Sequence, residues 1–168
     1  MCDRHNFEFD VDKAYEDQLV SAIEGSPAHP LQEPQAPPKS GVYVLYWAGS
    51  PVYVGQARNI LTRLRDHLKK IGYREGISAE QVTCRFLLMA RLWEVARAED
   101  ALIRRYNPEW NGIPGFSMHV PGRGRPGMPG YTNEWDRGFR HAVSTSGVIL
   151  LQRRRVWVLV YWSPVPRY

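Results

Sequence analysis

A stretch of fifteen residues, GVYVLYWAGSPVYVG at positions 41–55, restricts the fold more than any other part of the sequence. Aromatic and β-branched residues fill both of its halves, and Ala48-Gly49-Ser50 in the middle has the composition of a short loop. This pattern predicts a tight β-hairpin. If the turn closes around Gly49, Trp47 pairs with Pro51, and the register of the whole hairpin follows from that pair.

A tyrosine lies next to a glycine at each end of this hairpin. In the predicted register Tyr43 pairs with Gly55, and Tyr43, Leu45 and Tyr53 share one face of the sheet because side chains alternate between faces. A glycine opposite a phenol leaves room for another backbone or a ligand to approach closely. Two interpretations follow: the aromatic rings pack on a small sheet, or both phenols are presented to a substrate.

Hydrophobic periodicity predicts the remaining elements. A helix is expected over residues 11–24, a proline-rich connector that is neither helix nor central strand over 26–40, a helix ending at Gly72 over 58–71, a strand over 82–89 and a helix over 92–106. The chain is expected to be one compact domain with three parts: residues 1–40, a catalytic core at 41–111, and a basic Gly/Pro-rich loop with a C-terminal extension at 112–168.

The composition points to a polyanionic partner, because the 168 residues carry a net charge of +5. Cys2 and Cys84 lack the spacing of a zinc site or of a disulfide framework. The charged N-terminus does not resemble a signal peptide, and a cytoplasmic location in a bacterium is expected.

Three polar residues recur on one face of the helix predicted at 58–71. Asn59, Arg63 and His67 are spaced four residues apart, one position away from the apolar stripe of Ile60, Leu64, Leu68 and Ile71. Arg63 has a planar group of donors suited to a phosphate, and His67 exchanges a proton near neutral pH. The alternative for these residues is a solvated face, which is the interpretation adopted for Arg65 and for the lysines at 69 and 70.

Glu99 is the most informative residue of the helix predicted at 92–106. Helical spacing places it in the middle of an apolar stripe made by Leu92, Val95, Ala96, Leu102, Ile103 and Tyr106. A buried carboxylate needs a cation or must stay protonated. Because Mg²⁺ is commonly held by one or two carboxylates together with waters and a phosphate, a single inward Glu is sufficient for a metal site. The alternative is an internal salt bridge with Arg63.

Beyond this helix, Asn111 could bind a phosphate, steady a metal-bound water or cap the helix. Arg123 and Arg125 lie in the loop VPGRGRPG, and arginine is the usual partner of guanine. Contacts to phosphates alone are the alternative for this loop.

In this order, the residues resemble the GIY-YIG nuclease superfamily. The two triplets that give the superfamily its name stand here as GVY at 41–43 and YVG at 53–55. The downstream pattern is matched by YVGQARNILTRLRDH, the glutamate by Glu99 in EDALIRRYNPEWN, and the asparagine by Asn111. From about residue 25 to 136 the chain also resembles the type II restriction endonucleases of this superfamily that cut CCGCGG, the isoschizomers of SacII. Unlike that branch, this chain has a tight hairpin and no insertion before the helix that carries Arg63.

The resemblance implies an α+β fold with a small, mainly antiparallel sheet flanked by helices. It also implies Mg²⁺-dependent hydrolysis of double-stranded DNA, with Mn²⁺ as a substitute. Tyr43 would act as the base that activates water, and Tyr53 beside it would position the reacting groups or relay a proton. His67 would either lower the pKa of Tyr43 together with Arg63 or accept its proton; Arg63 would hold the phosphate, Glu99 the metal ion, and Asn111 would orient the phosphate.

The partners expected from the resemblance are double-stranded DNA, a second copy of the chain and a cognate DNA methyltransferase encoded with it. A short GC-rich palindrome is the expected target. The predicted DNA-contacting residues are Arg58, Asn59, Arg65, His119, Arg123 and Arg125. Two alternatives remain: a repair nuclease that selects DNA structures, and a DNA-binding module without catalysis.

Overall fold

The computed structural model describes residues 8–72, 74–117, 133–140, 148–153 and 156–161, which form an α+β arrangement. The elements in chain order are α1 (Val11–Gly25), β1 (His29–Pro30), β2 (Gly41–Trp47), β3 (Ser50–Ala57), α2 (Ile60–Ile71), a 3₁₀ turn (Ala79–Gln81), β4 (Val82–Leu88), α3 (Leu92–Tyr106), a 3₁₀ turn (Glu109–Gly112), α4 (Glu134–Gly138), β5 (Val148–Arg153) and β6 (Val156–Tyr161).

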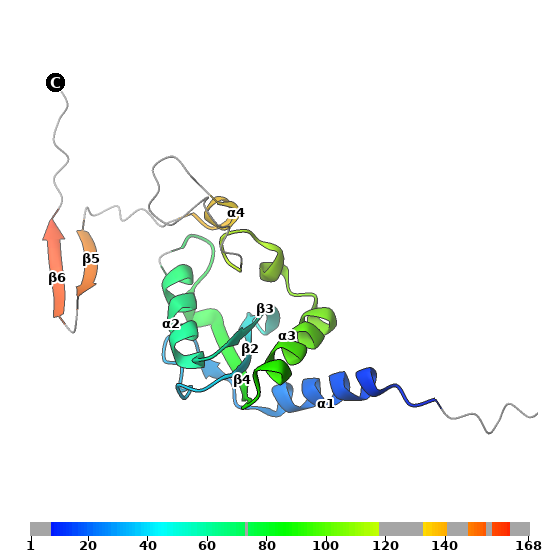
Figure 1. Ribbon diagram of the computed structural model, residues 1–168. Coiled ribbons are helices and arrows are strands. Elements are labelled where there is room, and N and C mark those ends of the chain that lie inside the picture. Colours follow the sequence, from blue (N-terminus) through cyan, green and yellow to red (C-terminus); the bar gives the residue numbers. More distant parts are fainter. Residues whose placement is uncertain (1–7, 73, 118–132, 141–147, 154–155, 162–168) are drawn as a thin grey trace, which may run out of the picture.

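Four of the strands form one antiparallel sheet in the order β1-β4-β2-β3 (Figure 1). The predicted fold class, a small antiparallel sheet of a hairpin and a third strand flanked by helices, is confirmed. The proline-rich connector contributes only β1, a two-residue strand at the edge of the sheet. This placement agrees with the prediction, because proline cannot donate to a ladder and is confined to sheet edges.

The hairpin keeps the predicted pairing of the tyrosines, although its turn differs from the prediction. Tyr43 lies opposite Gly55, but Trp47 pairs with Ser50 instead of Pro51, so the turn consists of two residues with positive φ. Such a two-residue turn, continued regularly, would place the two tyrosines on opposite faces of the sheet. A β-bulge between Leu45 and Tyr46 shifts the register by one residue and returns both phenols to the same face.

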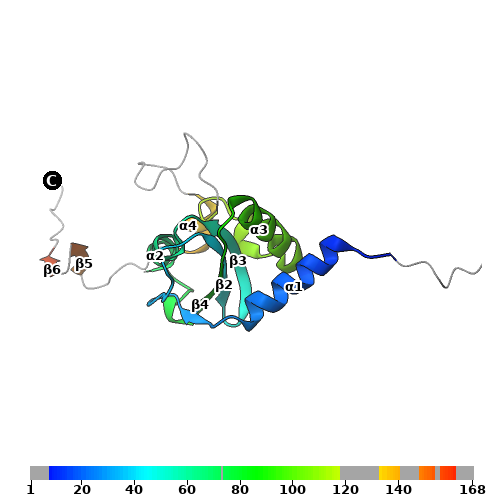
Figure 2. The same ribbon diagram turned by 60° about the horizontal axis from the view of Figure 1, so that its bottom comes forward.

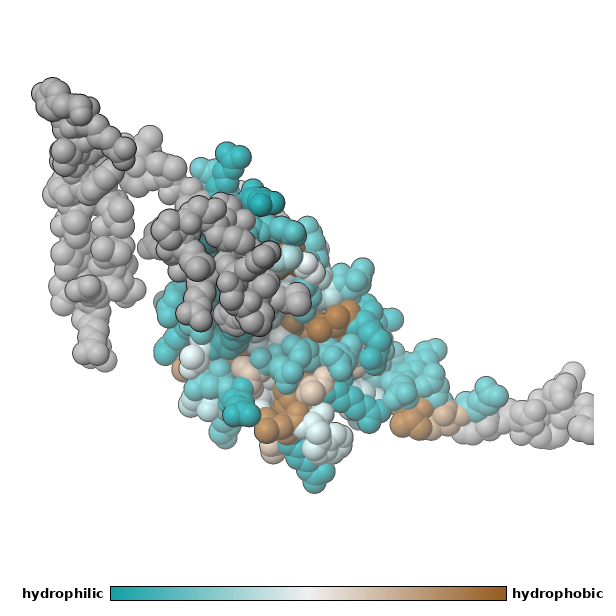
Figure 3. Space-filling model, turned by 45° about the horizontal axis from the view of Figure 1, so that its top comes forward, coloured by the Kyte–Doolittle hydropathy of each residue, from teal (hydrophilic) through white to brown (hydrophobic). Residues whose placement is uncertain are grey.

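Helices cover both faces of the sheet, α2 on one and α1 with α3 on the other (Figure 2). The core against α2 contains Tyr43, Tyr53 and an aromatic group around Trp110. The core against α1 and α3 contains Val42, Val44 and other aliphatic side chains. The strands β2 and β3 are therefore buried on both sides. The face of the molecule drawn in Figure 3 is mainly hydrophilic, with small hydrophobic patches.

The predicted bounds of the elements agree with the structure within one or two residues at each end. The last strand of the sheet ends at Leu88, one residue earlier than expected, and α3 begins and ends as expected. In the C-terminal extension β5 pairs with β6. Among the described residues, no helix has the length and apolar character needed to span a membrane.

Candidate active site

The two glycines of the hairpin make room for their neighbours. A Cβ atom on Gly55 would lie 2.5 Å from the hydroxyl oxygen of Tyr43 and 2.7 Å from a ring carbon of Tyr53. A Cβ on Gly41 would overlap the carbonyl oxygen of Leu87 in the neighbouring strand β4. The glycines thus permit a close approach, as expected. Gly55 leaves room for the two phenols, and Gly41 leaves room for the backbone of β4.

Tyr43 and His67 share a buried hydrogen bond. The hydroxyl oxygen of Tyr43 lies 2.7 Å from Nε2 of His67, and the exposed fractions of the two residues are 0% and 1%. The prediction placed His67 beside the apolar stripe of α2, but it belongs to that stripe, and Leu68 is only partly buried. The imidazole ring of His67 packs against the rings of Tyr53 and Phe116, whose centroids lie 4.8 Å and 5.0 Å from its own. This packing explains why the helix turns the side chain of His67 inward.

Burial determines the charge states of this pair. It raises the pKa of Tyr43 well above 10, and the charge of Arg63 lowers it only in part. Burial, followed by the charges of Arg63 and Lys70, lowers the pKa of His67 well below 6.5. A lowered pKa favours the uncharged imidazole, which offers no positive charge to lower the pKa of Tyr43. The alternative role of His67, a proton acceptor for Tyr43, fits the geometry.

Arg63 links the phenols to the outer part of the site. It is half-buried on α2, and burial lowers its pKa, but interactions with Tyr43 and Tyr53 outweigh that effect and raise it. Tyr53 itself is only 4% exposed. The phenols are therefore not presented at the surface as one interpretation expected, and Arg63 is the partly exposed residue of this group.

Glu99 lies at the edge of the apolar stripe of α3 instead of in its middle. Leu92 and Ala96 are exposed, and the helix packs on the sheet through Val95, Ala98, Ala101 and Leu102, which turns Glu99 to a half-buried position. One carboxylate oxygen accepts a hydrogen bond of 3.0 Å from the backbone nitrogen of Gln56.

The carboxylate of Glu99 makes no ion pair with a described residue. Burial raises its pKa, while the hydrogen bonds from Gln56 and the charge of Arg63 lower it. In the described ranges no ion pair joins Glu99 to Arg63, so the alternative of an internal salt bridge is not realised. Neutral donors of Gln56 therefore hold this carboxylate in place of a cation.

A phenol, an imidazole, an arginine and a carboxylate thus make up the candidate site. The family model of the Eco29kI GIY-YIG domain matches residues 48–143. The chain belongs to this family.

Curated relatives of the GIY-YIG domain include two proteins named UvrABC system protein C. That of Aquifex aeolicus is 30% identical over 89 residues, which cover 51% of this chain and 16% of the relative. That of Deinococcus radiodurans is 30% identical over 78 residues, which cover 46% and 13%. The chain thus spans about a sixth of the length of these relatives.

A solved structure that resembles the GIY-YIG domain is the N-terminal GIY-YIG endonuclease domain of UvrC from Thermotoga maritima, which was crystallised with magnesium. It is 21% identical, with a TM-score of 0.35, over 55% of this chain and 94% of that one. A point mutant of the same domain, in which phenylalanine replaces one tyrosine, is 23% identical, with a TM-score of 0.37.

Asn111 contacts the backbone of the GIY-YIG hairpin. Its amide oxygen accepts from the nitrogen of Val54 and its amide nitrogen donates to the oxygen of Val54, both at 2.8 Å. Because β3 is the last strand of the sheet, Asn111 here replaces a neighbouring strand. Together with the bond from Gln56 to Glu99, this contact fixes the outer edge of β3.

The predicted DNA-contacting residues occupy different positions. Asn59 is the N-cap of α2 and accepts from the backbone nitrogen of Thr62 at 3.0 Å. Arg58 and Arg65 are exposed. His119, Arg123 and Arg125 lie outside the described residues.

Lys70 has a role in the GIY-YIG domain that its sequence pattern did not reveal. It was assigned to a solvated face, yet its ammonium donates to the carbonyl oxygen of Phe116 at 2.8 Å and is partly buried. Phe116 packs on His67, so Lys70 fixes the segment that covers the imidazole. Its spacing of three residues from His67 was the available signal.

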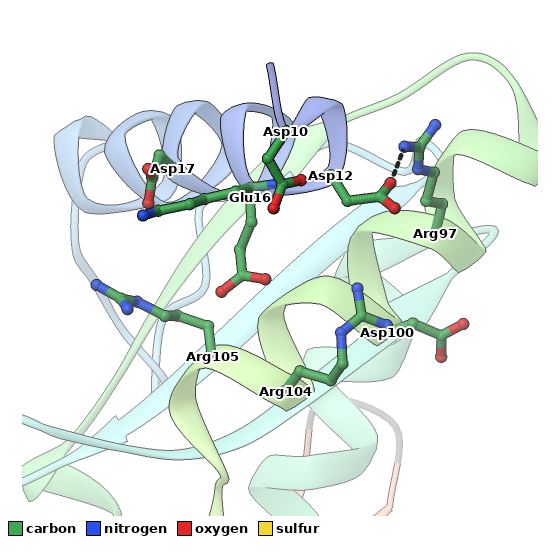
Figure 4. A pocket seen from close by; sticks show the side chains of 9 residues that line it. Asp10, Asp12, Glu16, Asp17, Arg97, Asp100, Arg104 and Arg105 are labelled. Atoms are coloured by element: carbon green, nitrogen blue, oxygen red, sulfur yellow. Dashed lines mark hydrogen bonds and ion pairs between the residues drawn. The ribbon is translucent and has the colours of Figure 1, made fainter. Parts of the chain in front are cut away.

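A larger hollow on the surface does not contribute to this site. It has a volume of about 780 Å³ and lies between α1 and α3 (Figure 4). Five carboxylates and four cations line it, and an ion pair of 2.8 Å joins Asp12 to Arg97. None of its lining residues belongs to the group around Tyr43.

The buried state of His67 predicts how stability depends on pH. The unfolded chain binds a proton near pH 6.5, whereas the folded chain resists protonation until a much lower pH. Stability is therefore unaffected above pH 6.5 and is lost below it, by at most about 1.4 kcal/mol per pH unit. Urea unfolding on both sides of pH 6.5 measures this slope. We expect His67→Gln to reduce the slope, and an unchanged slope in this variant would contradict the assignment.

Proposed function

We propose that the protein is a Mg²⁺-dependent endonuclease that hydrolyses phosphodiester bonds of double-stranded DNA. The observation that carries the proposal is the buried hydrogen bond of 2.7 Å between Tyr43 and His67, with Arg63 interacting with both phenols and its charge acting on Glu99. A phosphodiester needs a proton acceptor for the attacking water and positive charge around its oxygens, and this group contains both.

The proton can move through the pair without a cation beside Tyr43. As the hydroxyl of Tyr43 gives its proton to Nε2 of His67, the same oxygen takes a proton from the attacking water. Burial disfavours both the phenolate and the imidazolium, so the transfer takes place only as the water is deprotonated. Arg63 holds the phosphate oxygens through its guanidinium, and Tyr53 positions the guanidinium.

Glu99 fits a magnesium ion. Burial raises its pKa, this metal does not require a second carboxylate, and the hydrogen bonds of Glu99 come from the neutral Gln56 instead of a cation. When bound there, the ion would supply positive charge to the phosphate and to the departing oxygen. Among the described residues no group of three or more His, Cys, Asp or Glu side chains could hold a metal, so the remaining ligands would be waters and the phosphate.

The finer proposal is a type II restriction endonuclease of the bacterial cytoplasm that acts on a short GC-rich palindrome. The match of the Eco29kI domain over residues 48–143 supports it. In that role two copies of the chain would each cut one strand, and a cognate methyltransferase would protect the host DNA. The second candidate is a repair nuclease that selects DNA structures, which the likeness to UvrABC system protein C favours.

Mapping the ends of cleaved plasmids separates these candidates. The protein and its Glu99→Ala variant are incubated with plasmids of known sequence, in Mg²⁺ or in EDTA. We expect discrete double-strand cuts that disappear in EDTA and with Glu99→Ala, because EDTA removes the metal ion and the substitution removes its proposed protein ligand. Cutting only at flaps or junctions would support the repair nuclease. DNA retardation without any cutting, and without dependence on the metal, would overturn the proposal of an endonuclease.

A further inference from the structure

Two hollows meet at Arg58, beside the candidate active site. One, of about 340 Å³, lies between the end of β3 and the start of α3, where Gln56 and Leu92 line it. The other, of about 520 Å³, lies between the connector and the end of β4, where Lys39 and Leu88 line it. Ser40 and Arg58 line both of them, so the two hollows adjoin, and together they are called the groove below.

The floor of this groove is held by backbone hydrogen bonds. The carbonyl oxygen of Lys39 accepts from the nitrogen of Ile60, which begins α2, and the carbonyl oxygen of Ser40 accepts from the nitrogen of Met89, which follows β4. Both distances are 3.0 Å. The end of the connector is thus fixed between a helix and the sheet, and the groove is a formed feature of the fold.

An unusual mixture of side chains surrounds the groove. Leu88 and Leu92, which line the two hollows, are 47% and 57% exposed. Trp93 follows Leu92 in the chain and is 61% exposed, so three large apolar side chains near the groove face solvent. The cations Lys39 and Arg58 are exposed next to them, and neither makes an ion pair with a described residue. Unpaired cations beside an exposed tryptophan fit a polyanion that also offers flat apolar surface.

The groove is continuous with the candidate active site. Gln56, which lines it, donates its backbone nitrogen to Glu99. Leu92 lies seven residues before Glu99, on the same side of α3, which corresponds to about 10 Å along the helix. A strand of DNA that has a phosphate at Glu99 and runs along α3 toward Leu92 would meet the groove next to that phosphate.

We infer that this groove binds the DNA strand next to the scissile phosphate, with Lys39 and Arg58 on its phosphates and Leu92 and Trp93 against its sugars and bases. This inference rests on the proposed function and adds Lys39, Leu92 and Trp93 to the predicted DNA contacts. Phosphate contacts supply affinity that depends on salt, whereas apolar contacts supply affinity that does not.

The test measures binding of a short fluorescein-labelled duplex by fluorescence anisotropy, in EDTA, over a series of salt concentrations. We expect Lys39→Ala and Arg58→Ala each to lower the slope of log affinity against log salt by about one. The double variant Leu92→Ala, Trp93→Ala should weaken binding about tenfold at every salt concentration and leave the slope unchanged. Because all four side chains border solvent, thermal unfolding should remain at the wild-type temperature.

Two control variants isolate the effect of position. Arg105→Ala removes the same charge from the other side of α3, and Val11→Ala removes an exposed apolar side chain from α1; neither should alter binding as much. Wild-type affinity and slope in all the groove variants, in a protein that cuts plasmids, would overturn this inference alone. A change of oligomeric state in the Leu92, Trp93 double variant, measured by light scattering, would also overturn it, because the groove would then bind a second copy of the chain. A wild-type protein that neither binds nor cuts DNA would instead refute the proposed function.

Discussion

Tyr43→Phe is expected to lower the rate of DNA cleavage by about 10²- to 10⁴-fold and to leave DNA binding almost unchanged. The substitution removes the one oxygen that lies between His67 and the side of the site occupied by Arg63. Without it, the imidazole has no path to the attacking water, because its ring is 1% exposed and is enclosed by aromatic side chains. Single-turnover cleavage in Mg²⁺ measures the rate, and anisotropy in EDTA measures the binding.

The same substitution has a structural cost that must be separated from catalysis. It leaves Nε2 of His67 buried without a partner, which lowers the free energy of unfolding by about 1–3 kcal/mol. Tyr46→Phe is the matched control, because Tyr46 also lies on β2 and donates to Glu24 at 2.8 Å, but on the opposite face of the sheet. We expect this control to lose stability and to keep its cleavage rate. Normal cleavage by Tyr43→Phe, or loss of DNA binding, would show that Tyr43 is a packing residue.

The hairpin shows how far local sequence determines this fold. Alternation and the turn residues predicted the strands and the pair of Tyr43 with Gly55. The predicted turn was wrong by one residue, and the pairing was correct only because a bulge offsets that error. Whether a bulge forms depends on both neighbours of a strand, and here Asn111 fixes β3 from outside the sheet, 57 residues away in the sequence. Local propensity contains no information about that contact.

The helices were predicted correctly in extent but less well in orientation. Periodicity defines the apolar side of a helix only to within about one residue position, or about 100°. On α2 the structure chose His67 for the core and left Leu68 partly exposed, since a group of aromatic rings encloses the imidazole. On α3 the small side chains Ala98 and Ala101 allow close packing on the sheet, which turns Glu99 to the edge.

The buried state of the phenols has a consequence for the reaction. Tyr43 and Tyr53 are almost inaccessible in the unbound protein, while Arg63 and Glu99 are partly exposed. A phosphate can therefore reach the guanidinium and the carboxylate first, and the packing around the phenols must open before water meets Tyr43. In the proposed mechanism, DNA binding would supply the energy for that opening.

Gly55→Ala is expected to abolish cleavage and to lower the free energy of unfolding by about 1–3 kcal/mol or more. The added methyl group would lie 2.5 Å from the hydroxyl of Tyr43 and 2.7 Å from the ring of Tyr53. Neither ring can move away, because both are packed against His67 in the core. The hydrogen bond to His67 would then be displaced even in molecules that fold. Urea unfolding and plasmid cleavage measure the two effects.

Gly25→Ala provides the control for Gly55→Ala, since no atom lies within 4 Å of the position of its added methyl group. It should keep both stability and cleavage. Combining Gly55→Ala with Tyr43→Phe tests the cause directly: removing the hydroxyl relieves the shortest of the contacts, so the double variant should be more stable than the sum of the two single losses. If the losses in the free energy of unfolding of the two single variants simply add, the hydroxyl of Tyr43 does not contact the methyl group added at position 55. The close approach of the phenol would then not explain why the hairpin has a glycine there.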